Sequence, residues 1–116
     1  MTTMQERRAE VRMMCADLAE VFWRDRDGTT RHAVALLEDI SQSGVCLQLE
    51  MPIPLGTAIR WEHPGQKFEG HVRYCAYREI GYFVGVQLQG DSKWSRKAFK
   101  PQHLLDPRKL VANAAK

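Results

Sequence analysis

The chain has 116 residues, of which 44% are hydrophobic and 27% are charged, and its net charge is +3. This length and composition indicate one globular domain and exclude a collagenous or low-complexity chain. The apolar stretches are only a few residues long, which argues against a membrane span, and the three cysteines lack the C-x-x-C spacing of a redox or zinc motif.

The first third of the chain fits two secondary structures. By propensity, a helix would run from about Met4 to Glu20, starting at a capping box formed by Thr3 and Glu6. The alternative is an exposed arm through Arg12, followed by a strand over residues 16–24. Periodicity does not separate the two, because neither face of the strand is purely apolar. The next strand needs a pairing partner, which favours the arm and the strand.

Strands are expected along most of the remaining chain. Residues 32–40 (HAVALLEDI) indicate one strand, and apolar side chains at alternate positions predict several more. Turns rich in glycine and proline separate these runs, so about six short strands suggest a closed or sandwiched β unit. The side chains expected to face inward are Val45, Leu47, Leu49, Ile59, Trp61, Phe68, Gly70, Val72, Tyr74, Ala76, Tyr82, Val84, Val86 and Leu88.

The end of the chain is predicted to form a short helix and a basic tail. Asp91 and Ser92 can cap a helix from Lys93 to about Lys100, which Pro101 would end. We therefore divide the chain into an arm (residues 1–12), a β-barrel (13–92) and a C-terminal helix with a basic tail (93–116). The barrel segment has seven basic and eleven acidic side chains, a charge of −4, which argues against general nucleic-acid binding.

The first candidate binding motif is a cluster of arginines near the N-terminus. Arg8 and Arg12 form an R-x-x-x-R pattern, and Arg7 precedes it. The planar fork of an arginine matches guanine O6 and N7 or two phosphate oxygens, and its flat face stacks on a base. The alternative is a solvated cluster paired with Glu6 and Glu10. With 11 arginines in the chain, about one such pattern is expected by chance, so this motif alone is weak evidence.

The second candidate motif is D-x-S-x-x-G, formed by Asp39, Ser41 and Gly44 at a turn between two expected strands. An ionised Asp39 can accept hydrogen bonds from the N1–H and N2 groups of guanine, and the Ser41 hydroxyl can donate and accept. Gly44 would let the backbone approach a ligand. An ordinary Asx-type turn is the alternative. From the composition, this pattern arises by chance on the order of one time in 70.

These two motifs, in this order, resemble the PilZ family of cyclic di-GMP receptors. The resemblance covers roughly residues 7–90 and rests on RRAEVR, DISQSG and the segment YFVGVQL at residues 82–88. It implies an all-β fold, a six-stranded antiparallel β-barrel with a flexible N-terminal arm and a short C-terminal helix. It also implies a bacterial, cytoplasmic binding protein with no cofactor, whose ligand is cyclic di-GMP.

The resemblance also implies roles for individual residues. Arg8 and Arg12 would clamp the nucleotide, with Arg7 assisting, and an aromatic residue of the fifth strand would stack on it. Tyr74 is the candidate for that aromatic residue, although the alternation allows it to lie in the core. The ligand-binding residues expected from the sequence are Arg7, Arg8, Arg12, Asp39, Ser41, Gly44 and Tyr74.

Two functions are compatible with this pattern. In the first, cyclic di-GMP orders the arm, and the ordered arm presents a new surface to a protein of the motility, exopolysaccharide or virulence machinery. In the second, the same fold is a protein-interaction adaptor that binds no nucleotide. An enzyme is not expected, because no catalytic triad, metal cluster or phosphate-binding glycine loop is present in the sequence. Arg73 and Arg78 could extend a phosphate-binding surface, but they are interpreted as solvated strand-edge charges.

Overall fold

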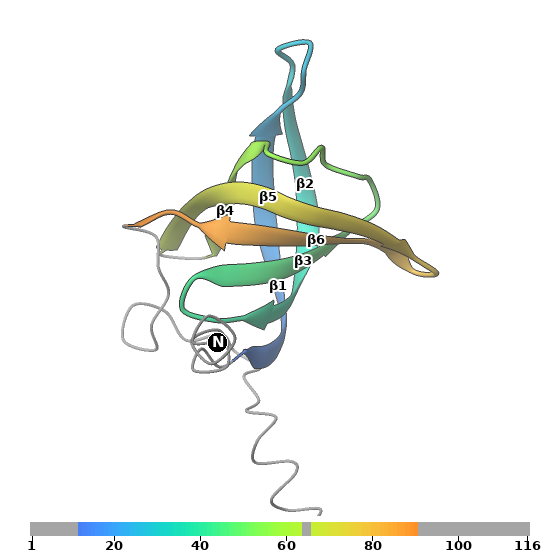
Figure 1. The fold of residues 1–116 in the computed structure, drawn as a ribbon. Helices are drawn as coiled ribbons and strands as arrows, with labels where there is room; N and C mark the ends of the chain where they lie inside the picture. The colour runs from blue at the N-terminus through green and yellow to red at the C-terminus, as the bar shows by residue number, and fades with distance from the viewer. Residues whose placement is uncertain (1–11, 64–65, 91–116) are drawn as a thin grey trace, which may run out of the picture.

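The structure is a computed structural model that describes residues 12–63 and 66–90. The regular elements of this part are six antiparallel strands that form a closed barrel in the order β1-β2-β3-β6-β5-β4 (Figure 1). The strands are β1 (Met13–Arg24), β2 (Thr30–Ile40), β3 (Gly44–Leu49), β4 (Ala58–His63), β5 (Gln66–Arg78) and β6 (Gly81–Leu88). The expected six-stranded all-β barrel is confirmed.

The ambiguity in the first third of the chain is resolved in favour of a strand. A helix through Glu20 is wrong, because β1 already begins at Met13. β1 pairs with β2 over most of its length, and its residues Glu20–Trp23 also pair with Ile59–Glu62 of β4. Backbone groups bonded on both sides of β1 override the local helix propensity. The remaining part of the expected helix and arm, residues 1–11, and the C-terminal helix, lie outside the described residues.

The barrel encloses one core of alternating side chains. Trp61 is fully buried and stacks on Phe68 with 4.4 Å between the ring centroids. Both were expected in the core rather than at a binding surface, and this is confirmed. The alternation is confirmed at Val45, Leu47, Leu49, Ile59, Trp61, Phe68, Gly70, Val72, Val84, Val86 and Leu88, all of which are buried.

Three β-bulges interrupt this alternation. The pairing of β1 with β2 shifts between Met14 and Asp17, and that of β2 with β3 shifts between Leu37 and Asp39. β5 shifts against β6 between Val72 and Tyr74, which leaves Arg73 as the extra residue. A bulge reverses the side of the sheet that the following residues face. The inward orientation expected for Tyr74 is therefore wrong, and 45% of its surface is exposed.

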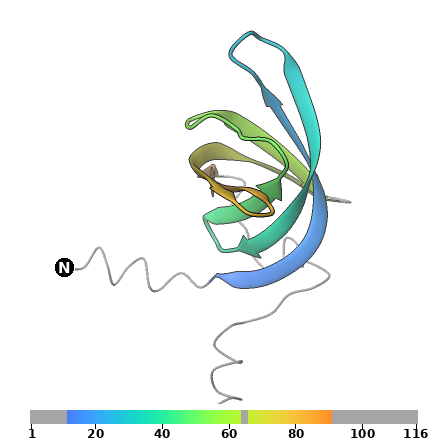
Figure 2. The same ribbon diagram turned by 90° about the vertical axis from the view of Figure 1, so that its right-hand side faces the viewer.

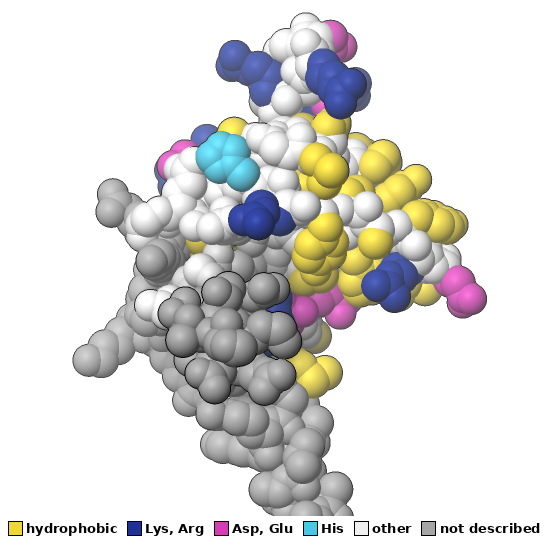
Figure 3. Space-filling model, viewed as in Figure 1, with side chains coloured by type: hydrophobic (Ala, Val, Ile, Leu, Met, Phe, Trp, Pro, Cys, Tyr) yellow, Lys and Arg dark blue, Asp and Glu magenta, His cyan; other side chains and the backbone are white. Residues whose placement is uncertain are grey.

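Two hairpins extend beyond the barrel. The β1–β2 hairpin projects at the top of Figure 1, the β5–β6 hairpin projects at its right, and Figure 2 shows the first from the side. Hydrophobic side chains gather on the face between them (Figure 3), and Leu55, Tyr77 and Ile80 are each more than half exposed. Within the described residues, no helix is long and apolar enough to cross a membrane.

Candidate functional site

The candidate site is built on a row of paired residues that crosses five neighbouring strands. Met14 pairs with Asp39, Asp39 with Cys46, Cys46 with Gly85, and Gly85 with Tyr74. Each step spans about 4.8 Å, the spacing of adjacent strands. The three bulges adjoin this row, and two of them place Asp39 and Tyr74 on the outer face of the barrel. The row therefore joins the second sequence motif to the candidate aromatic residue.

Arg12 lies at one end of this row. It precedes β1, and its Nη1 donates to Oδ1 of Asp39 at 2.6 Å. Both side chains remain open to solvent, with exposed fractions of 55% for Arg12 and 28% for Asp39. Exposed pairs of this kind contribute about 0–1 kcal/mol to stability. The last arginine of the first motif and the first residue of the second thus meet across 27 positions of the sequence.

The turn between β2 and β3 holds the rest of the second motif. The Ser41 backbone N–H donates to the Gly44 carbonyl at 2.8 Å, and the Ser41 hydroxyl donates to the same oxygen at 3.3 Å. Ser41 is only 2% exposed, so its hydroxyl stabilises the turn, which is the role expected of a serine in an ordinary turn. A Cβ on Gly44 would lie 3.3 Å from the Val86 carbonyl oxygen and 3.9 Å from Nη2 of Arg12. The tight contact is the one with β6, since 3.9 Å is an ordinary van der Waals distance, so glycine eases the approach of β3 to β6.

Tyr74 closes the row at its other end. Its hydroxyl is hydrogen-bonded to the thiol of Cys46, and its ring covers Gly85. Burial, with the Cys46 contact as the second cause, raises the pKa of Tyr74 to about 12. The phenol therefore stays neutral at physiological pH, and the ring offers an uncharged aromatic surface beside Arg12 and Asp39.

These residues border a hollow of about 600 Å³ on the outside of the barrel. It brings together four of the seven residues expected from the sequence, Arg12, Ser41, Gly44 and Tyr74, while Asp39 is attached through Arg12. Arg7 and Arg8 lie outside the described residues. The hollow is lined by Arg12, Ser41, Ser43, Gly44, Val45, Arg73, Tyr74, Gly85, Val86 and Gln87.

Sequence reasoning missed Gly85 as a part of this hollow and set Arg73 aside as a solvated charge. Arg73 is exposed, as expected, but as the extra residue of the β5 bulge it borders the site next to Tyr74. Gly85 is paired with Tyr74. Neither position carries a signal in the sequence, because both depend on the register between β5 and β6.

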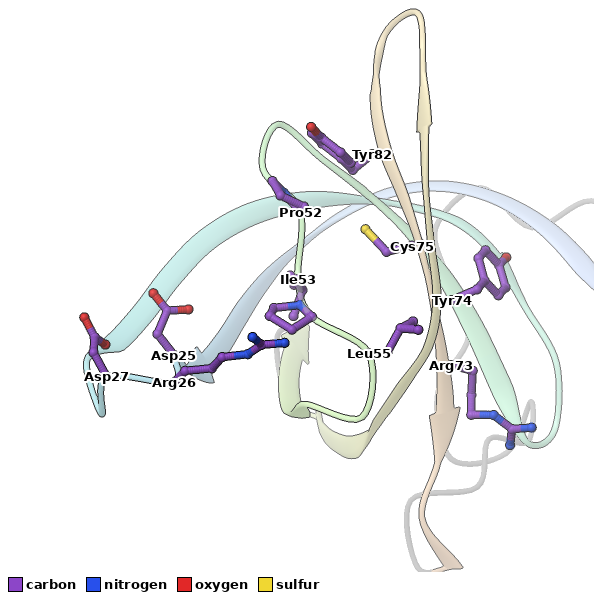
Figure 4. Close-up of a pocket in the computed structure, with 11 residues that line it drawn as sticks. Asp25, Arg26, Asp27, Pro52, Ile53, Leu55, Arg73, Tyr74, Cys75 and Tyr82 are labelled. Atoms are coloured by element: carbon purple, nitrogen blue, oxygen red, sulfur yellow. The ribbon is translucent and has the colours of Figure 1, made fainter.

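A second, larger hollow lies on the other side of β5. Its volume is about 940 Å³, and it shares Arg73 and Tyr74 with the first. In Figure 4, Arg73 and Tyr74 project from one side of the β5–β6 hairpin, whereas Cys75, Ile53 and Leu55 lie on the opposite side. The β5 bulge therefore adjoins both hollows.

The chemistry of the first hollow suits binding. Two arginines and an aromatic ring can hold a flat, anionic ligand, and a carboxylate can accept hydrogen bonds from it. The nearby thiols are poor nucleophiles. Burial and Asp17 raise the pKa of Cys15 to about 12, and burial also raises the pKa of Cys46. Among the described residues, no group of histidine, cysteine and carboxylate side chains could hold a metal ion.

Comparison with known proteins agrees with this architecture. The family model of the PilZ domain matches residues 6–100. A similar solved structure is that of the Bacillus subtilis inhibitor of motility (MotI/DgrA), with a TM-score of 0.50 and 13% identity. The match covers 92% of this chain and 51% of that one, so the chain spans about half the length of this neighbour. A search of curated protein sequences found no match. With most of its length matched by the family model, the chain belongs to the PilZ domain family.

Proposed function

We propose that this chain is a bacterial cytoplasmic receptor for cyclic di-GMP that passes the signal to another protein. Membership of a family of binding and adaptor domains supports this function rather than catalysis. The observation that carries the proposal is that Arg12 and Tyr74 line one hollow and that Arg12 is bonded to Asp39, although the three residues come from three strands or their ends. This set combines a cation, a carboxylate and an aromatic ring.

Each of these groups matches one part of the ligand. Arg12 binds a phosphate or the O6 and N7 edge of guanine through its planar fork. Asp39 accepts hydrogen bonds from the N1–H and N2 groups of guanine, and a base stacks on the Tyr74 ring. The ion pair between Arg12 and Asp39 has to open or rearrange, which costs little because both side chains are exposed.

The preceding arginines can reach the same ligand. Arg8 and Arg7 lie four and five positions before Arg12, a span of up to about 14–18 Å in an extended chain. In this proposal they close over the ligand, and the closed arm becomes the surface that a target protein recognises. The favourable contacts of the charged forks are offset by the entropy lost when the arm is ordered.

Titration calorimetry with cyclic di-GMP tests the proposal. The wild-type chain is expected to bind, and Arg12→Ala is expected to reduce the affinity at least 30-fold, about 2 kcal/mol, since hydrogen bonds to charged groups contribute about 1.5–3 kcal/mol each. Arg26→Ala is the matched control. It removes the same charge from the exposed β1–β2 hairpin and should leave the affinity within about twofold. Equal affinities for wild type and Arg12→Ala would reject the clamp.

The second candidate function is that of a protein adaptor that needs no nucleotide. The exposed hydrophobic side chains between the two hairpins favour it, because contiguous apolar surface commonly marks contacts with other proteins. A flat cyclic di-GMP titration of the wild-type chain, together with capture of a motility or secretion protein that Leu55→Ser weakens, would favour this function over the first.

A further inference from the structure

We infer that Gly85 is a positioning residue of the nucleotide site, because its missing side chain creates the seat in which the Tyr74 ring lies flat on the barrel. This inference rests on the proposed function for its effect on the ligand. The seat itself is a property of the chain without any ligand, and it can be tested separately.

The space above Gly85 is filled by the tyrosine ring. A Cβ built on Gly85 would lie 2.0 Å from Cε2, 2.4 Å from Cδ2 and 2.5 Å from Cζ of Tyr74. These distances are far below van der Waals contact, so the ring cannot keep its place over any other residue. The three nearest atoms all belong to the tyrosine side chain, and the Gly85 backbone does not adopt a positive φ. The tyrosine ring therefore makes the closest contacts that exclude a side chain at position 85.

Cys46 fixes the far end of the same ring. It is the other neighbour of Gly85 in the row, on β3, and it is only 4% exposed. Its hydrogen bond to the Tyr74 hydroxyl means that the side chain reaches from β5 across β6 to β3. The ring is thus held against the sheet, and its outer face borders the hollow that contains Arg12.

The next residue of the row beyond Cys46 is Asp39. A base that stacks on the outer face of the Tyr74 ring consequently has Asp39 on the side to which the hydroxyl end of the ring points, one strand beyond Cys46. The seat therefore lets the ring stack on a guanine base while Asp39 accepts hydrogen bonds from its edge, because the N1–H and N2 groups of guanine point along the base plane. A ring displaced from Gly85 would lose this relation while Arg12 and Asp39 stayed in place.

A cycle of four proteins tests the seat without ligand. The proteins are the wild type, Gly85→Ala, Tyr74→Ala and the double variant, and thermal unfolding is measured for each. In the wild-type background, Gly85→Ala is expected to lower the midpoint, because the ring is expelled. In the Tyr74→Ala background, the same change should leave the midpoint equal or raise it, because alanine suits a strand better than glycine when nothing lies above it. Gly90→Ala is the matched control, because no other atom of residues 12–63 and 66–90 lies within 4 Å of a Cβ built there.

The same four proteins are then titrated with cyclic di-GMP. Gly85→Ala and Tyr74→Ala should each lower the affinity about tenfold, as expected for the loss of one stacked base. The double variant should bind no more weakly than Tyr74→Ala alone, because Gly85 acts only through the ring. Gly90→Ala should bind as the wild type does.

Two results would overturn the inference. If Gly85→Ala lowered the thermal unfolding midpoint equally with and without the Tyr74 ring, the ring would not occupy the space above Gly85. Unchanged affinity of Gly85→Ala would show that the seat does not position the ligand. Failure of the wild-type chain to bind cyclic di-GMP would overturn the proposed function and the ligand role of the seat, while the unfolding midpoints would still support or overturn the seat.

Discussion

At the scale of single residues, Asp39 combines a small contribution to stability with a large expected contribution to binding. Its carboxylate accepts a hydrogen bond from the exposed guanidinium of Arg12 at 2.6 Å. Asp39→Asn keeps the shape of the side chain and removes its charge and one acceptor. We expect cyclic di-GMP to bind at least tenfold more weakly by calorimetry, while the free energy of unfolding in urea changes by less than about 1 kcal/mol.

The barrel offers a matched control for this change. Glu62 is paired with Arg60 at 3.0 Å, and their exposed fractions of 31% and 45% resemble those of Asp39 and Arg12. Glu62→Gln removes the same charge from an equivalent exposed pair and should leave nucleotide affinity unchanged. A similar loss of affinity in both variants would mean that Asp39 acts through general charge and not by contacting the base.

Residues of the site differ in how far the sequence predicts them. The two motifs predict that Arg12 and Asp39 serve one site, because both residue types suit a guanine nucleotide, but they do not predict the direct contact between the two side chains. The place of Tyr74 was not decided by alternation, since an extra residue at Arg73 reverses the side that it faces. Gly85 was not found at all, because only the pairing between β5 and β6 shows which side chain covers it.

At the scale of secondary structure elements, Gly70 allows β5 and β6 to approach each other closely. A Cβ on Gly70 would lie 2.2 Å from the backbone carbonyl oxygen of Gln87. This atom belongs to the neighbouring strand and cannot rotate away, in contrast to the ring above Gly85. Gly70→Ala is therefore expected to destabilise the fold by about 2 kcal/mol or more, measured by urea unfolding.

The glycine at position 90 again supplies the comparison. No atom of the described residues lies within 4 Å of a Cβ built there, so Gly90→Ala should change the free energy of unfolding by less than about 0.5 kcal/mol. Equal costs at the two positions would mean that β5 and β6 can separate without loss, contrary to the close approach in the structure.

The strands themselves were largely predictable. Regular alternation in β3 and β4 reflects one face that points into the core, and the buried side chains of Val45, Leu47 and Trp61 follow it. β1 was ambiguous because Asp17 faces inward and is only 5% exposed, which interrupts the apolar pattern. Its strand conformation is set by pairing with distant residues of β2 and β4, and local propensity contains no information on that pairing.

At the scale of the whole molecule, the free energy of unfolding is expected to fall as the pH rises above about 9. The pKa of Cys15 rises from 9.0 to about 12 in the folded chain, chiefly through burial. Between these values the unfolded chain releases a proton that the folded chain retains, so the free energy of unfolding falls as the pH rises from about 9 to 12. Tyr74, with its pKa raised to about 12, acts in the same direction.

Cys15→Ser isolates the thiol in this dependence. Serine has a similar shape and does not titrate in this range, so the variant should lose stability less steeply than the wild type above pH 9. Urea unfolding at a series of pH values measures the two slopes. Parallel slopes would mean that the Cys15 thiol ionises as easily in the folded chain as in the unfolded one.

β1 both closes the barrel and holds one residue of the candidate site in position. β1 carries Arg12 just before its first residue and forms the seam with β4 through Glu20–Trp23 near its other end. One strand thus completes the enclosure and delivers the guanidinium to the carboxylate of β2. Under the proposed function, loss of the pairing between β1 and β4 would abolish nucleotide binding while both sequence motifs stayed intact. The motifs are then necessary for binding but do not suffice without the closed barrel.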